Sequence, residues 1–148
     1  MNTIPSRAIA EARRWIGTPY RHQAATKGAG ADCLGLVRGV WRELYGREPQ
    51  DVPAYTPDWS EPSRDEALCR AAVKHLVPRA ERFPQPGDVI LFRMRDGAVA
   101  KHLGIAASSG GGPTFIHAYS GHGVVESALS TPWARRIAAC FAFPEEIR

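Results

Sequence analysis

One stretch limits what this chain can fold into: a glycine-rich loop, residues 28–32, that leads directly into a cysteine and a helical pattern. Asp32 stands where an N-cap is expected, so the pattern predicts that Cys33 lies in the first turn of a helix. We expect this helix to continue to about Tyr45, where Gly46 ends it. Its apolar residues recur at helical spacing, at Leu34, Val37, Trp41 and Leu44.

Cys33 is a candidate nucleophile because of this position. Backbone N–H groups and the positive end of the helix dipole favour a thiolate at a helix start. The alternative is that Cys33 is a small buried apolar residue, which is a common role of free cysteines. Whether histidines elsewhere in the chain can act with Cys33 distinguishes the catalytic role from the packing role.

Composition sets the broad class. The length of 148 residues predicts one domain, residues 1–148, and 44% hydrophobic with 23% charged residues is ordinary for a soluble globular protein. The net charge of +4 comes without a basic run interleaved with aromatics, so nucleic acid is not an expected partner. The three cysteines are widely spaced and form no C-x-x-C motif, which argues against a disulfide framework and a structural zinc site.

No stretch is apolar enough for a secretory signal or a membrane span, so we expect no membrane insertion. We expect the protein to be made in the cytoplasm without a signal peptide. Any work outside the cytoplasm would then need another export route.

The order of elements predicts an α+β domain. A helix is expected over residues 1–15, ended by Gly17 and Pro19, and residues 46–62 read as an irregular, packed loop. Ser63 and Glu66 resemble a capping box before a further amphipathic helix. Short strands of an antiparallel sheet are then expected at residues 89–92, 102–107, 114–119, 124–127 and 137–143.

Two histidines fall on neighbouring strands of this sheet. If residues 108–111 form the connecting loop, Ala107 pairs with Gly112 and His102 lies opposite His117. Directly opposed side chains point to the same face, with Cβ atoms about 5 Å apart. Gly104 and Ala106 would share that face and leave room there, while Leu103 and Ile105 would face the core.

This arrangement would serve thiol chemistry: Cys33 attacks, His102 holds or returns its proton, and His117 orients the His102 ring. A helix-start N–H could donate to an oxyanion. The same three side chains could alternatively bind zinc with an open fourth position.

Five segments follow one another along the chain: Trp15-Ile-Gly-Thr-Pro-Tyr20, Asp32-Cys-Leu-Gly-Leu36, Pro86-Gly-Asp-Val-Ile-Leu-Phe92, His102-Leu-Gly-Ile105 and Phe115-Ile-His-Ala118. In this order they resemble the NlpC family of bacterial cell-wall cysteine peptidases, which have a compact papain-like fold. Each segment alone is a weak signal, whereas the ordered set is specific and extends over nearly the whole chain.

The resemblance implies a role for each matching residue. Cys33 corresponds to the nucleophile, His102 to the general base and His117 to the polar residue that orients the base. Tyr20 matches a tyrosine that shapes the oxyanion and substrate site, and Asp32 matches an aspartate that meets the free amine of a stem peptide. Packing at a helix end is the alternative for Tyr20, and N-capping is the alternative, or additional, role of Asp32.

The activity implied by the resemblance is hydrolysis of an amide bond in peptidoglycan stem peptides, with γ-D-glutamyl–diaminopimelate as the favoured bond and no cofactor. Leu34 stands where many members have serine, which leaves the exact substrate open. The variant Asp-Cys-Leu-Gly-Leu-Val over residues 32–37 is most similar to a subgroup encoded among tail genes of phages and gene transfer agents. Tail or baseplate proteins would then be partners, and the enzyme would act at the cell wall.

Two alternatives remain at this point. The chain could be a structural tail-tip or baseplate component that retains an enzyme fold. It could also be a thiol amidase or acyltransferase that acts on another substrate.

Overall fold

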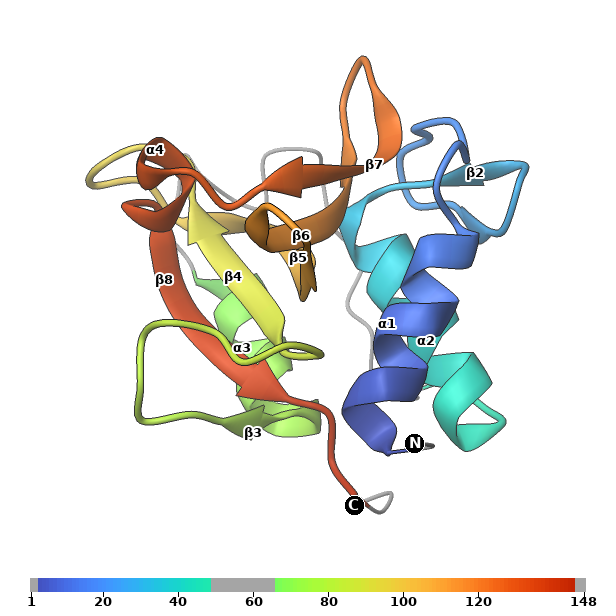
Figure 1. Ribbon diagram of the computed structural model, residues 1–148, viewed down its shortest axis with the longest axis horizontal. Coiled ribbons are helices and arrows are strands. Elements are labelled where there is room, and N and C mark those ends of the chain that lie inside the picture. The colour runs from blue at the N-terminus through green and yellow to red at the C-terminus, as the bar shows by residue number, and fades with distance from the viewer. Residues whose placement is uncertain (1–2, 49–65, 146–148) are drawn as a thin grey trace.

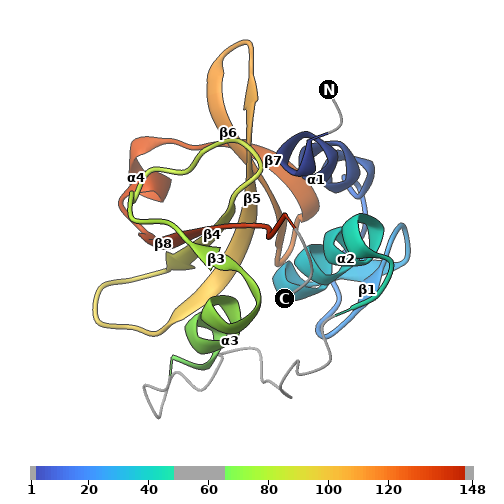
Figure 2. The same cartoon turned by 90° about the horizontal axis from the view of Figure 1, so that it is seen from below.

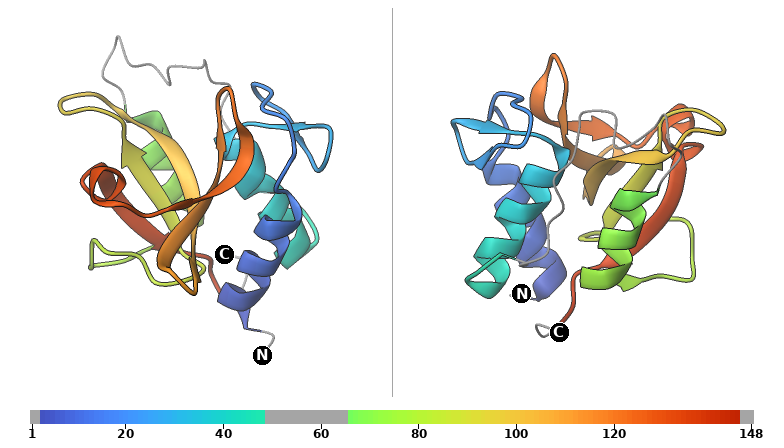
Figure 3. Two further views of the ribbon diagram at one scale, coloured as in Figure 1. Left: turned by 45° about the horizontal axis from the view of Figure 1, so that its top comes forward. Right: turned by 180° about the vertical axis from the view of Figure 1, so that it is seen from behind.

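The computed structural model describes residues 3–48 and 66–145, and it has a helical layer beside an antiparallel sheet (Figure 1). The helices are α1 (Ile4–Arg14), α2 (Cys33–Tyr45), α3 (Ala67–His75) and the single turn α4 (Thr131–Ala134). Figure 2 shows α1 and α2 side by side on one side of the sheet, and both views in Figure 3 place α3 apart from them. The architecture is therefore the α+β arrangement expected from the sequence.

The main sheet has six strands in the order β3-β8-β4-β5-β6-β7, and the hydrogen-bonded neighbours run antiparallel. Two short strands, β1 (Ala25–Thr26) and β2 (Gly30–Ala31), form a separate ribbon just before α2. The strands of the main sheet are β3 (Val77–Pro78), β4 (Val89–Arg93), β5 (Ala100–Ser109), β6 (Gly112–Tyr119), β7 (Gly123–Ala128) and β8 (Ile137–Ala142).

Both faces of the sheet are covered, which explains why β4 is apolar throughout instead of alternating. Leu91 on one face belongs to the cluster that packs against α1 and α2, whereas Ile90 and Phe92 belong to a cluster on the other face with Trp133. On β5, Leu103 and Ile105 point to the helices, as predicted.

The contact between α1 and α2 is close because a glycine faces an aromatic ring. A Cβ built on Gly39 would lie 2.0 Å from Trp15 Cζ2, so the Trp15 ring occupies the space that any larger residue would need. Substitution there would force the two helices apart. This packing fixes α2, and with it Cys33, against the sheet.

The helix boundaries match the predictions closely. Gly46 ends α2 in the left-handed conformation with φ +80, which glycine adopts at no steric cost. The first helix begins at Ile4 and not at Met1, because Thr3 caps it by accepting a hydrogen bond from the Ser6 N–H. Most of the predicted loop at residues 46–62, and Ser63 of the predicted capping box, lie outside the described residues, while Glu66 is the N-cap of α3 without a side-chain cap bond.

Candidate active site

Cys33 is the first residue of α2, and its side chain lies against β5. Asp32 caps the helix because its Oδ1 accepts a hydrogen bond of 2.7 Å from the Gly35 N–H. The Cys33 Sγ lies 3.8 Å from the Lys101 carbonyl oxygen, and the Leu103 N–H also points at it. The thiol is therefore held beside the backbone on both sides of His102.

The pKa of the Cys33 thiol is raised to about 12, and burial is the main cause. The negative charge of Asp32 raises it further, while the N–H groups of Leu103, Leu34 and Cys33 lower it. The helix-start N–H groups thus act in the expected direction, but desolvation of a side chain that is 7% exposed outweighs them. Burial therefore opposes the thiolate that the helix start was expected to favour.

His102 and His117 make direct contact. His102 Nε2 lies 2.7 Å from His117 Nδ1, and the two rings meet edge to face with centroids 5.0 Å apart. His117 Nε2 in turn lies 2.9 Å from Ser127 Oγ on β7. The result is a chain of three side chains across β5, β6 and β7.

The predicted strand register was wrong by two residues. Ala107 pairs with Thr114, not Gly112, because only Gly110 and Gly111 stand between the paired residues Ser109 and Gly112. A shift of two residues preserves the face, so the histidines still meet, but diagonally and not directly opposite each other. The room predicted at Gly104 is filled, since a Cβ there would lie 2.9 Å from the Phe115 ring.

Both imidazoles are neutral at physiological pH. Burial, and secondly the His117 charge, lower the pKa of His102 to about 3, and burial together with His122 lowers the pKa of His117 to about 4. Because His102 uses Nε2 toward His117, its Nδ1 is the nitrogen that can take a proton from a thiol. That tautomer has His102 Nε2–H donating to His117, and His117 Nε2–H donating to Ser127.

Cys33 and His102 share no hydrogen bond within residues 3–48 and 66–145. The Sγ contacts on either side of His102 nonetheless place the thiol beside this residue. Catalytic hydrogen bonds are often long or poorly aligned before substrate binds. The structure thus shows the thiol at the backbone of residues 101–103, and proton transfer to the His102 ring during attack belongs to the proposed function.

Tyr20 and Asp32 both lie near the thiol. Tyr20 forms an isolated parallel bridge with Ala31, and its pKa is raised to about 12 by burial and by the charges of Cys33 and Asp32. Asp32 is 2% exposed, and its Oδ2 accepts a 2.7 Å hydrogen bond from the Gln23 N–H. The N-cap role of Asp32 is thus confirmed, and its contact with a substrate amine stays a prediction.

Two site residues were missed by the sequence reasoning. Ser127 orients His117, and only the strand pairing of β6 with β7 reveals it. Trp133 of α4 packs its ring 5.8 Å from that of His102 and 5.3 Å from that of His117, measured between centroids. The helix that carries Trp133 could have been predicted from Pro132, because proline is favoured in the first turn of a helix and Pro132 occupies that place in α4.

Three further points of the sequence analysis concern His122, a zinc site and a membrane span. His122 is on an exposed turn, as predicted, where it stacks on Tyr119. Within the described part of the chain, no three His, Cys, Asp or Glu side chains are placed to hold a metal ion, so the zinc alternative has no ligand set there. No helix in that part is both long and apolar enough to cross a bilayer.

Several solved structures share this fold. The NlpC/p60 domain of the peptidoglycan hydrolase SagA superimposes with a TM-score of 0.63 at 22% identity, over 94% of this chain and 98% of that one. NlpC2 from Trichomonas vaginalis gives 0.65 at 19% identity, over 97% of this chain and 48% of that one. At these identities the likeness establishes the fold.

Sequence relatives extend the comparison. The murein DD-endopeptidase MepS/murein LD-carboxypeptidase of Escherichia coli K12 is 30% identical over 134 residues, which are 90% of this chain and 60% of that protein. The γ-DL-glutamyl hydrolase of Bacillus subtilis 168 is 30% identical over 125 residues, 82% of this chain and 25% of that protein. The chain thus spans less than two thirds of either relative. The model of the NlpC/P60 family matches residues 17–141, and this chain belongs to that family.

Proposed function

We propose that this protein is a cysteine peptidase that hydrolyses an amide bond in peptidoglycan stem peptides. The observation that carries the proposal is the position of the Cys33 thiol at a helix start, beside His102, whose ring is held by His117. Family membership and the names of the two relatives, a murein endopeptidase and a γ-DL-glutamyl hydrolase, support the substrate class.

The reaction proceeds through an acyl-enzyme. Cys33 Sγ attacks the carbonyl carbon while its proton passes to His102 Nδ1, and the Cys33 N–H at the start of α2 can donate to the oxyanion. The C–N bond then breaks, and the amine leaves with the proton from His102. A water molecule, deprotonated by His102, attacks the thioester and regenerates the thiol.

The γ-D-glutamyl–diaminopimelate bond is the proposed cleavage site. The B. subtilis relative carries γ-DL-glutamyl hydrolase in its name, which agrees with this choice. The proposed contact of Asp32 with the substrate amine would lie beside His22, which is partly exposed and whose Nδ1 lies 3.7 Å from Asp32 Oδ2. Leu34 in place of a serine makes product identification necessary.

We also propose that a phage-like tail delivers the enzyme to the cell wall. This proposal rests on the Asp-Cys-Leu-Gly-Leu-Val sequence of residues 32–37. It predicts that the protein co-purifies with tail or baseplate proteins from particles of its host.

Digestion of purified sacculi tests the enzymatic proposal. The unaltered protein should clear the suspension, and mass spectrometry should identify products cut at the γ-D-glutamyl bond. Cys33→Ala should abolish clearing, while Cys69→Ala, which removes a partly exposed thiol on α3, should retain it. Full clearing by Cys33→Ala would remove Cys33 from the mechanism, and no clearing by the unaltered, folded protein would favour a structural tail component.

A further inference from the structure

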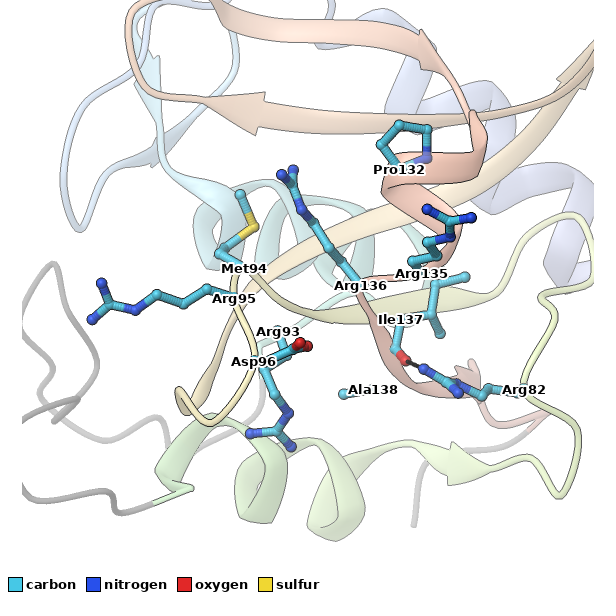
Figure 4. A pocket seen from close by; sticks show the side chains of 10 residues that line it. All are labelled: Arg82, Arg93, Met94, Arg95, Asp96, Pro132, Arg135, Arg136, Ile137 and Ala138. Atoms are coloured by element: carbon cyan, nitrogen blue, oxygen red, sulfur yellow. Dashed lines mark hydrogen bonds between the residues drawn. The ribbon is translucent and has the colours of Figure 1, made fainter.

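A pocket of about 660 Å³ lies where the β4–β5 turn approaches α4 and the start of β8 (Figure 4). Its position is separate from the thiol, since Cys33 does not line it. Among its described lining residues, one is acidic, Asp96, and half are basic. The basic residues are Arg82, Arg93, Arg95, Arg135 and Arg136.

The arginines differ in how far their charge is already balanced. Arg93 donates to the Glu66 carboxylate at 2.6 Å and to the Ala98 carbonyl, so it is neutralised within the fold. Arg82, Arg135 and Arg136 form no ion pair with any carboxylate of the described residues. The pocket therefore has a surplus of positive charge from these three guanidinium groups.

Two of the three guanidinium groups are already held in place. Arg82 donates Nε–H and Nη2–H to the Ile137 carbonyl at 2.9 and 2.6 Å, drawn as a dashed line in Figure 4. Arg136 lies over the Trp133 ring, with Cζ 5.2 Å from its centroid. A carbonyl and an aromatic ring orient a guanidinium without cancelling its charge. Groups ordered in this way lose less conformational entropy when they bind an oxyanion.

The rest of the lining suggests which oxyanion fits. Asp96 supplies one carboxylate that could take an amine, and apolar side chains complete the wall. A peptide with several carboxylates and one amine matches both signs of charge in this lining. The apolar lining residues are Met94, Pro132, Ile137 and Ala138.

Trp133 connects this pocket to the candidate active site. Its ring contacts Arg136, which lines the pocket, and also contacts both His102 and His117. We propose that the arginine pocket binds the carboxylates of an acidic peptide, a part of the same wall substrate that lies beyond the bond attacked. This inference rests on the proposed function and adds a substrate-binding position to it.

Calorimetry on the full chain carrying Cys33→Ala tests the proposal without turnover. The probe is the soluble stem peptide L-Ala-γ-D-Glu-diaminopimelate-D-Ala. Adding Arg135→Glu, or Arg136→Gln, should weaken binding about tenfold, because each removes a charge-assisted hydrogen bond to a carboxylate. Arg47→Glu is the matched control, since it reverses one exposed charge just beyond α2 and should leave the affinity unchanged.

Three results would overturn the proposal: no binding of the peptide, equal affinity in the Arg135, Arg136 and Arg47 variants, or displacement of the peptide by an equal concentration of inorganic phosphate. The last result would show a site for any oxyanion. Sacculus digestion by the protein with Cys33 intact is measured in parallel. If sacculi are digested and the arginine substitutions have no effect, only the proposed role of the pocket is rejected. If sacculi are not digested at all, the proposed function is rejected.

Discussion

At the scale of single residues, burial shifts the thiol and the imidazole of the candidate site toward their neutral forms. The pKa of Cys33 is raised to about 12 and that of His102 is lowered to about 3, in each case chiefly by burial. A preformed thiolate–imidazolium pair would need the opposite shifts. Under the proposed mechanism, these shifts favour general-base activation of Cys33 at the moment of attack.

Alkylation of Cys33 reports its protonation state. Because the neutral thiol is favoured, the rate with iodoacetamide should rise steadily with pH and show no plateau between pH 6 and 9. Peptide-resolved mass spectrometry separates Cys33 from Cys69 and Cys140. A plateau near neutral pH, attributable to Cys33, would instead show a stabilised thiolate.

Ser127 is predicted to be a positioning residue. Ser127→Ala removes the 2.9 Å partner of His117 Nε2, so the imidazole chain loses its fixed tautomer and kcat should fall about fivefold to tenfold with little change in KM. Ser108→Ala, in the exposed end of β5, is the matched control. Equal kcat values for the two variants would mean that Ser127 has only a packing role.

At the scale of elements, the β5–β6 hairpin determines how the histidines meet. Gly104→Ala would place a Cβ 2.9 Å from the Phe115 ring and 3.5 Å from His117 Cβ. We expect this crowding to cost about 1–3 kcal/mol of unfolding free energy and to lower kcat by moving His117. Gly110→Ala, whose Cβ would have no atom within 4 Å, is the control, and urea unfolding of both variants is the measurement. Equal stability of the two variants would contradict the packing described.

The sequence was sufficient to predict the main elements, because their signals are local. The cap at Asp32, the stop at Gly46 and the apolar run of β4 each depend on neighbouring residues. The hairpin register depended on choosing between a four-residue and a two-residue glycine turn, and composition could not decide between them. Ser127 and Trp133 join the site only through strand pairing and aromatic packing between distant segments.

At the scale of the whole molecule, burying two neutral histidines makes stability depend on pH. The pKa values of His102 and His117 in the folded protein, about 3 and about 4, lie below the ordinary value of 6.5. Between pH 4 and pH 6.5 the unfolded chain binds more protons at these histidines than the folded protein does. The free energy of unfolding is therefore highest above pH 6.5 and falls as the pH is lowered. The loss approaches about 1.4 kcal/mol per pH unit for each histidine.

Urea unfolding between pH 4 and pH 7 checks this dependence. His102→Gln should remove part of the slope, because a neutral amide does not gain a proton on unfolding. His122→Gln, on the exposed turn, should keep most of it. A slope unaffected by the change at His102 would assign the acid sensitivity to other groups.

The most direct test of the central claim is detection of the acyl-enzyme. The protein is mixed with excess stem peptide, quenched in acid within the first turnover, and digested for mass spectrometry. The account predicts a thioester adduct, with the mass of the acyl half of the substrate, on the peptide that contains Cys33. Hydrolysis that proceeds with no adduct, or with the adduct on Cys69 or Cys140, would contradict it.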